Sequence, residues 1–234
     1  MELPKTYPAW VFDDSPIADP LGYGERAVNF ILNLRHPRSH LPGKGFAGRQ
    51  AFRRDHLLGF ADAGDGGAIG LDGTRIVKTV FLMMPRGNRK TALGAALALL
   101  HTIGPEREIA GQVVCAAADQ KQARIAFEEA SNLIRQDARL ERVAEVASYR
   151  NRITNRQNAA WLEAISADGA TQHGRTPAFV LADELHAWKK RDLWEALKTG
   201  LVKTAGALNV IITTAGRGHE NIAFEQYDYA RRVA

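Results

Sequence analysis

Two stretches of this 234-residue sequence combine residue types that can act on phosphates. The first, Met84-Pro85-Arg86-Gly87-Asn88-Arg89-Lys90-Thr91, lies between an apolar run and an Ala/Leu-rich segment. A loop between a strand and a helix presents backbone N–H groups to a phosphate, and a Lys and a hydroxyl at its end bind phosphate oxygens and Mg²⁺. Lys90 and Thr91 occupy those two places, so we predict a phosphate-binding loop here.

This loop departs from the usual pattern, which has Gly at its first position and before the Lys. Met84 and Arg89 occupy these positions, and only Gly87 and Asn88 supply backbone freedom. A left-handed φ at a non-Gly residue costs about 1–2 kcal/mol. Taken alone, the segment is equally well explained as a basic turn before a helix.

The second stretch is the apolar run 179–182, which is followed by two carboxylates, Asp183 and Glu184. In nucleotide hydrolases the first carboxylate holds Mg²⁺ and the second polarises the attacking water. An acidic loop or a helix cap is the alternative for this stretch alone. The two motifs support each other because they occur in the expected order, each after a buried strand.

Other segments could assist such a site. Thr213, Thr214 and Gly216 end a further apolar run, where hydroxyls can sense the γ-phosphate and couple its loss to movement; β-branched strand residues are the alternative explanation. Arg175, in the loop 173–177, is expected near one edge of the nucleotide site, as an arginine finger acting on a neighbouring subunit, or simply as a solvated loop residue. We interpret His186 as a structural or helix-start residue.

The elements that must position these residues alternate between strands and helices, which predicts an α/β fold with a mostly parallel sheet flanked by helices. Ligands in such sheets bind at the carboxyl ends of the strands. The expected strands are 76–83, 112–117, 142–147, 149–155, 160–166, 178–182 and 208–214. The expected helices are 25–34, 49–60, 90–103, 120–140, 192–202 and 219–233, with a loop at 61–73. We divide the chain into an N-terminal helical extension, 1–60, and a core, 61–234.

Composition sets broader limits. The hydrophobic fraction of 45% and the charged fraction of 24% are typical of a globular domain, and the net charge of +5 is compatible with contact to nucleic acid. The lone Cys115 can form no internal disulfide, which favours a reducing compartment. No secretory signal pattern begins the sequence, and no apolar stretch is long enough to span a bilayer. We therefore expect a cytoplasmic protein.

Four segments together resemble the large terminase subunit of tailed bacteriophages over roughly residues 45–230. They are MMPRGNRKTALGAALALLHTIGP, VVCAAADQKQARIAFEEASNLI, FVLADELHAW and NVIITTAG. The resemblance implies a P-loop NTPase fold of the additional-strand, RecA-like type, with ATP and Mg²⁺ as ligands.

The resemblance also implies a role for each matching residue. The phosphate loop (Walker A) supplies Arg86, Gly87, Asn88, Arg89, Lys90 and Thr91 to ATP, with Thr91 also on Mg²⁺. The acidic strand end (Walker B) supplies Asp183 to Mg²⁺ and Glu184 as the catalytic carboxylate. Thr213, Thr214 and Gly216 match the coupling motif, and Gln50 stands where the family has a Gln that reads adenine.

The implied function is that of the ATP-hydrolysing motor that packages double-stranded DNA into a procapsid in the host cytoplasm. The implied partners are double-stranded DNA, the portal protein, the small terminase subunit and further copies of the chain in a ring, with the isolated domain a monomer. Family members carry a C-terminal nuclease domain, for which this sequence has no carboxylate cluster, so we expect no nuclease activity.

Two alternatives remain open at the level of the sequence. One is another P-loop DNA translocase or helicase-like ATPase, since Asp183-Glu184-Leu185-His186 has the form of a helicase box. The other is a catalytically weak scaffold that only binds DNA, for which Arg89 is the support. ATP turnover with and without double-stranded DNA distinguishes these alternatives.

Overall fold

The computed structural model describes residues 22–35, 75, 77–87, 89–168, 174–216 and 218–233. The strands are β1 (Thr79–Met83), β2 (Gln112–Ala117), β3 (Ala144–Ala147), β4 (Arg152–Asn155), β5 (Trp161–Ser166), β6 (Phe179–Asp183) and β7 (Leu208–Thr213). The helices are α1 (Tyr23–Asn33), α3 (Lys90–Thr102), α4 (Gln120–Arg135), α5 (Ala138–Val143), α6 (Asp192–Val202) and α7 (Ile222–Val233), with short 3₁₀ helices η2 (Ser148–Arg150) and η3 (Leu185–Ala187).

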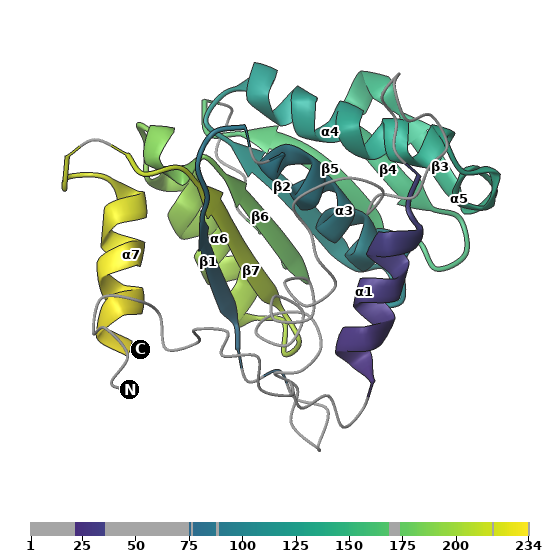
Figure 1. Cartoon of the computed structure of the whole chain (residues 1–234), viewed down its shortest axis with the longest axis horizontal. Coiled ribbons are helices and arrows are strands. Elements are labelled where there is room, and N and C mark those ends of the chain that lie inside the picture. Colours follow the sequence, from purple (N-terminus) through teal and green to yellow (C-terminus); the bar gives the residue numbers. More distant parts are fainter. Residues whose placement is uncertain are drawn as a thin grey trace.

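The strands form one seven-stranded sheet in the order β1-β7-β6-β2-β5-β4-β3 (Figure 1). β1, β7, β6, β2 and β5 are parallel, whereas β4 runs antiparallel to β5 and β3 antiparallel to β4. This confirms the predicted α/β fold with a mostly parallel sheet. One further strand, β7, separates the strand before the phosphate loop from the strand before the two carboxylates.

Two apolar layers cover the faces of the sheet. On one face, α1, α3 and α4 pack against alternate strand residues such as Val113, Leu162 and Leu181. On the other face, α6, η3 and α7 pack against the intervening residues of the same strands, such as Val114 and Val180. The central strand β6 is buried along its whole length, which explains why its sequence is continuously apolar up to Asp183.

The helix expected over 120–140 is divided in two. α4 begins as expected, where the Asp119 carboxylate accepts a hydrogen bond from the Gln122 N–H at 2.9 Å. It ends at Arg135 because Asp137 adopts an extended backbone, and its carboxylate accepts the Arg139 N–H at 2.9 Å to cap a new helix, α5. An Asp inside an apparently continuous helical pattern therefore acts as a second start signal.

Several sequence predictions fall outside the described residues, namely the helix 49–60, the loop 61–73, Gln50, Asn88 and His173. The described part of the N-terminal region, α1, packs against α3 and contributes Ala27, Val28 and Ile31 to the core. Among the helices described, none is both long enough and apolar enough to cross a membrane.

A candidate nucleotide site at the carboxyl edge of the sheet

The parallel order of β1, β7 and β6 brings three of the predicted motifs to one edge of the sheet. Met83, the last residue of β1, pairs with Thr213, the last residue of β7. Asp183, the last residue of β6, pairs with Ile212. The phosphate loop, the two hydroxyls and the two carboxylates therefore follow neighbouring strand ends, although they lie far apart in the sequence.

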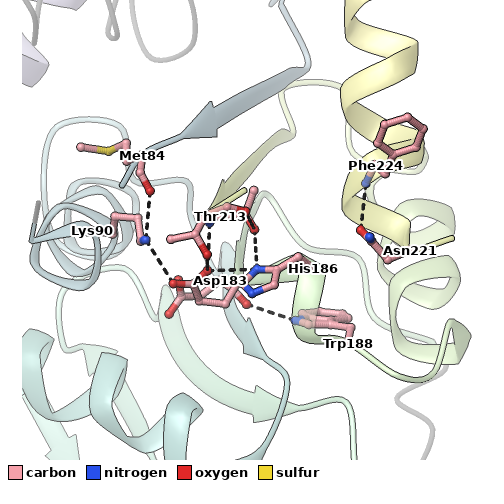
Figure 2. Close-up of polar contacts among 10 residues, drawn as sticks. Met84, Lys90, Asp183, His186, Trp188, Thr213, Asn221 and Phe224 are labelled. Carbon is pink, nitrogen blue, oxygen red and sulfur yellow. Dashed lines mark hydrogen bonds and ion pairs between the residues drawn. The ribbon is translucent and has the colours of Figure 1, made fainter. Parts of the chain in front are cut away.

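The phosphate loop is tied to β7 and ends in a strained residue. The Met84 N–H donates to the Thr213 carbonyl at 3.0 Å, and the Lys90 ammonium donates to the Met84 carbonyl at 3.1 Å (Figure 2). Arg89 precedes α3 with φ 52° and ψ 35°, the left-handed conformation that the missing glycine would have adopted without strain. No side-chain hydrogen bond from the described residues caps α3. The N–H groups in the first turn of a helix can bind an anion.

Glu184 lies opposite the phosphate loop, and both of its carboxylate oxygens are engaged. Oε1 lies 3.1 Å from the Lys90 Nζ. Oε2 accepts hydrogen bonds from the Thr214 N–H at 3.0 Å and from the Thr214 hydroxyl at 3.1 Å. Burial acts to raise the pKa of the Glu184 carboxyl, but the hydrogen bonds from Thr214 and the interactions with Lys90 outweigh it and hold the pKa below its usual range. Glu184 is therefore an ionised carboxylate at neutral pH.

Backbone strain accompanies the placement of Glu184. Its φ of 48° and ψ of 47° place it in the left-handed region between β6 and η3. The Glu184 N–H still continues the strand ladder to the Ile212 carbonyl at 2.8 Å. An L-residue in this conformation is uncommon outside turns and functional sites. The turn allows Glu184 to reach across β7 towards Lys90 and Thr214.

Asp183 has a different environment from its neighbour. Its side chain is buried, and its carbonyl accepts the Trp188 indole N–H at 3.1 Å (Figure 2). Desolvation, and secondarily the Glu184 carboxylate, raise the pKa of Asp183 to about 6, although Lys90 acts in the opposite direction. A buried carboxylate beside a second carboxylate is an arrangement that a divalent cation stabilises.

A cleft of about 720 Å³ joins these groups to α4. It is lined by Arg86, Gly87, Arg89, Lys90, Thr91, Ala92, Ala118, Asp119, Gln122, Ile125, Glu129, Glu184, His186 and Ala187. Most of the described phosphate-loop residues line this cleft together with Glu184. Thr91 lines the cleft, whereas Asp183 is not among the lining residues. A Thr hydroxyl and an Asp carboxylate are both oxygen donors of the hard type that Mg²⁺ prefers.

Arg175 does not belong to this cleft, and the expectation that its loop emerges beside the nucleotide site is wrong. The loop precedes β6, so it lies at the amino edge of the parallel sheet, opposite the edge where Asp183 ends the strand. Its guanidinium is paired with Glu163 at 3.0 Å, beside the Trp161 ring at the start of β5. The side chain of Arg175 is only 15% exposed.

His186 is a residue of the cleft that the sequence did not reveal as functional. Its Nδ1 lies 2.9 Å from the Thr213 hydroxyl and 3.2 Å from the Glu184 Oε2 (Figure 2). The sequence signal was the helicase-like spacing Asp183-Glu184-Leu185-His186, but only the left-handed turn at Glu184 explains why the ring returns to the carboxylate.

Comparison with known proteins gives this arrangement a family. The family profile described as the ATPase domain of the terminase large subunit matches residues 71–232. The chain belongs to this family. The match includes every described residue of the candidate site.

Individual relatives agree with this terminase assignment. The large terminase subunit of Enterobacteria phage HK97 is 26% identical over 194 residues, which are 82% of this chain and 36% of that protein. The crystal structure of the HK97 large terminase matches with a TM-score of 0.76 and 24% identity, covering 90% of this chain and 41% of that one. A mutant of the large terminase ATPase domain of Thermus phage P74-26 matches with a TM-score of 0.50 and 20% identity over 63% of each chain.

The match to the HK97 structure shows that this chain shares its fold with the large terminase. The chain spans less than half the length of the HK97 relatives.

Proposed function

We propose that this chain is the ATP-hydrolysing motor domain of a terminase large subunit, which powers the packaging of double-stranded DNA into a procapsid. The observation that carries the proposal is the position of Glu184, which bridges Lys90 of the phosphate loop and Thr214 at the end of β7. One carboxylate is thereby placed between the group that binds phosphate and the strand end that can respond to its loss.

Lys90 and the uncapped start of α3 are the proposed phosphate ligands, with Arg86, Gly87, Asn88 and Arg89 forming the loop. The Lys90 ammonium lies 3.1 Å from Oε1 of Glu184, which neutralises its charge. A phosphate of ATP offers a stronger negative charge, so Lys90 moves onto the β and γ oxygens and releases Oε1 of Glu184. ATP binding itself thus frees the proposed base.

Glu184 acts as the general base that orients and deprotonates the attacking water. A base has to be ionised before the reaction, and the lowered pKa of Glu184 satisfies this condition. Thr91 and Asp183 would hold Mg²⁺, which supplies charge neutralisation at the phosphates. The raised pKa of Asp183 supports this role because burying that carboxylate without a cation is unfavourable.

Thr213, Thr214 and Gly216 are the proposed coupling residues. Thr214 contacts the Glu184 carboxylate through both its N–H and its hydroxyl. A change in Glu184 when the γ-phosphate leaves therefore alters the end of β7 directly. This is a short physical link between hydrolysis and movement. Gln50, which lies outside the described residues, is proposed to contact the adenine.

The partners follow from the family. We propose that the domain acts on double-stranded DNA in a ring of identical subunits at the portal, together with the small terminase subunit, in the host cytoplasm. The net charge of +5 is compatible with contact to DNA phosphates. The helicase-like and scaffold alternatives are less favoured because the family profile and the HK97 relative both name terminases.

Turnover of Mg²⁺–ATP by the purified chain, measured with and without double-stranded DNA, tests this proposal. Lys90→Ala should weaken nucleotide binding at least about 10-fold, since it removes a charged phosphate ligand. Glu184→Gln should retain binding and lose at least about 100-fold in turnover, since the amide cannot accept the proton. Exposed residues of the same types, Lys203→Ala and Glu141→Gln, are the matched controls.

Two results would contradict the assignment. Wild-type turnover by Glu184→Gln would show that another group is the base. Absence of Mg²⁺-dependent turnover by the wild-type chain, at any protein or DNA concentration tested, would favour the scaffold alternative.

A further inference from the structure

The two oxygens of the Glu184 carboxylate have unequal surroundings. Oε1 has the Lys90 ammonium at 3.1 Å. Oε2 is approached by three groups, the Thr214 N–H at 3.0 Å, the Thr214 hydroxyl at 3.1 Å and the His186 Nδ1 at 3.2 Å. Oε2 therefore has more polar neighbours than the roughly two lone-pair sites of one carboxylate oxygen, whereas Oε1 is freed once Lys90 moves to a phosphate.

The hydrogen-bond partners also fix where the His186 ring carries its hydrogen. The Thr213 hydroxyl is fully buried and donates to the Thr214 carbonyl at 3.1 Å. With that hydrogen assigned to the Thr214 carbonyl, the Thr213 oxygen is the acceptor towards His186 Nδ1 at 2.9 Å. An ionised Glu184 can likewise only accept. Because the Thr213 oxygen and Oε2 of Glu184 are both acceptors in this arrangement, we assign the ring hydrogen to Nδ1.

Packing around the ring keeps His186 in this position. A Cβ atom on Gly216 would lie 2.9 Å from the His186 Cβ, so the residue after β7 that touches the ring has to be glycine. The Trp188 indole N–H, bonded to the Asp183 carbonyl at 3.1 Å, closes the η3 turn from the other side. The ring thus lies between the turn after β6 and the segment after β7.

We propose that His186 is a positioning residue for the catalytic base, an inference that rests on the proposed ATPase function. Its Nδ1–H, together with Thr214, holds Oε2 of Glu184 so that Oε1 is the oxygen that faces the attacking water. The water oxygen bonds to the γ-phosphorus, its proton passes to Oε1, and the bond to the bridging oxygen breaks with its electron pair remaining on ADP.

This role makes His186 part of the coupling as well as of catalysis. Its ring contacts the base through Oε2 and the end of β7 through the Thr213 hydroxyl. A rotation of the Glu184 carboxylate after hydrolysis would therefore change its own hydrogen bonds to Thr214 directly and would reach Thr213 through the His186 ring. Thr213 and Thr214 of the proposed coupling motif are thus both linked to the position of the Glu184 carboxylate.

Steady-state kinetics of two substitutions at His186 test the role. Asn carries a side-chain N–H near the position of Nδ1, whereas Leu fills similar space without a donor. Loss of one hydrogen bond to a charged group should lower kcat of His186→Leu about 10- to 100-fold. His186→Asn should stay within about threefold of the wild type, and both variants should keep their affinity for a non-hydrolysable ATP analogue within about twofold. His219→Leu, at an exposed histidine stacked on Phe224, is the matched control.

The outcomes separate the positioning role from simpler explanations. Wild-type kcat in His186→Leu, or an equal loss in the Asn and Leu variants, would overturn it. A wild-type chain without turnover would instead remove the proposed ATPase function, and the positioning role with it. If His186→Leu does not fold, ¹⁵N NMR of the wild-type ring decides, since an Nε2–H form with an unprotonated Nδ1 contradicts the role and an Nδ1–H form supports it.

Discussion

Asp183 and Glu184 are adjacent carboxylates whose pKa values shift in opposite directions. Desolvation, and then the neighbouring Glu184 charge, raise the pKa of Asp183 to about 6. Glu184 is partly exposed and accepts hydrogen bonds from Thr214 and Lys90, which lower its pKa despite its partial burial. Carboxylates separated in this way can take different roles, one as a cation ligand and the other as an ionised base.

Asp183→Asn should stabilise the ligand-free domain at neutral pH. A raised carboxyl pKa means that Asp183 contributes stability at pH values below about 3.8, which is lost as the pH rises through about 6. Asn has no charge to bury, so its advantage in unfolding free energy should be near zero at about pH 4 and reach about 1–3 kcal/mol at about pH 7.5. Denaturant unfolding at both pH values measures this difference.

The exposed Asp168→Asn is the control for this measurement and should change little with pH. An Asp183→Asn variant that is no more stable than the wild type at about pH 7.5 would show that burial does not raise the pKa of this carboxyl. Loss of Mg²⁺-dependent turnover in Asp183→Asn would be a separate, functional result.

Elements of the sheet explain which parts of the site could be predicted from the sequence. Lys90, Thr91, Asp183, Glu184 and Thr214 each lie within two residues of a strand or helix end that apolar patterning located. Parallel strands collect such ends at one edge. The contacts between them depend on two left-handed residues, Arg89 and Glu184, and sequence patterns do not predict how such turns direct a side chain.

The expectation that Arg175 lies near the nucleotide site was wrong because a sequence pattern does not show the direction in which a strand runs through the sheet. The distance between Arg175 and Asp183 along the sequence is short, but the whole of β6 lies between them, and the strand direction assigns them to opposite edges. Strand order and direction were needed to see this. His186 was interpreted from the sequence as a structural or helix-start residue, because the sequence pattern does not show the left-handed turn at Glu184 that brings the ring to the carboxylate.

Arg175→Ala should therefore lower stability without changing kcat per folded molecule. It removes a largely buried ion pair with Glu163, in which the two side chains are 15% and 26% exposed. We expect a loss of about 1–3 kcal/mol in unfolding free energy, measured by denaturant unfolding. Arg191→Ala breaks the exposed pair with Glu225 and should cost less than Arg175→Ala, because solvent screens both charges.

The arginine-finger hypothesis for Arg175 makes a different prediction that the same variant tests. A finger acting on a neighbouring subunit would lower turnover by about 10³–10⁵ in the assembled state. Mixing Arg175→Ala with Glu184→Gln protein would then restore activity at interfaces that combine the two intact residues. Unchanged turnover of assembled Arg175→Ala leaves only the structural role.

At the scale of the whole molecule, the described residues form one domain built around a single sheet, with α1 contributing to the same core as α3. Within the described ranges, no group of three or more His, Cys, Asp or Glu side chains is arranged to hold a metal ion. The chain covers 36% of the HK97 large subunit to which it is similar.

We predict that the purified chain does not cleave DNA. Supercoiled plasmid incubated with the protein and Mn²⁺ should remain supercoiled on an agarose gel, while a metal-dependent nuclease in parallel linearises it. Cleavage that co-purifies with the chain through successive columns would contradict the prediction. Glu184→Gln protein provides a matched preparation in which ATP turnover should be lost but any contaminating nuclease would persist.

The position of β7 between β1 and β6 limits where this domain can deform. β7 is hydrogen-bonded along both sides, to β1 from Asn209 to Thr213 and to β6 from Leu208 to Ile212. We therefore expect the three strands to move as one rigid unit, because sliding one strand past its neighbour would break all the backbone hydrogen bonds between the two. The strand pairing ends at Thr213, and the next N–H, that of Thr214, donates to the Glu184 carboxylate in place of a strand carbonyl. The first residue after β7 is thus bonded to the proposed catalytic base, so we expect the chemistry at Glu184 to change how tightly the chain is held at the point where it leaves the sheet.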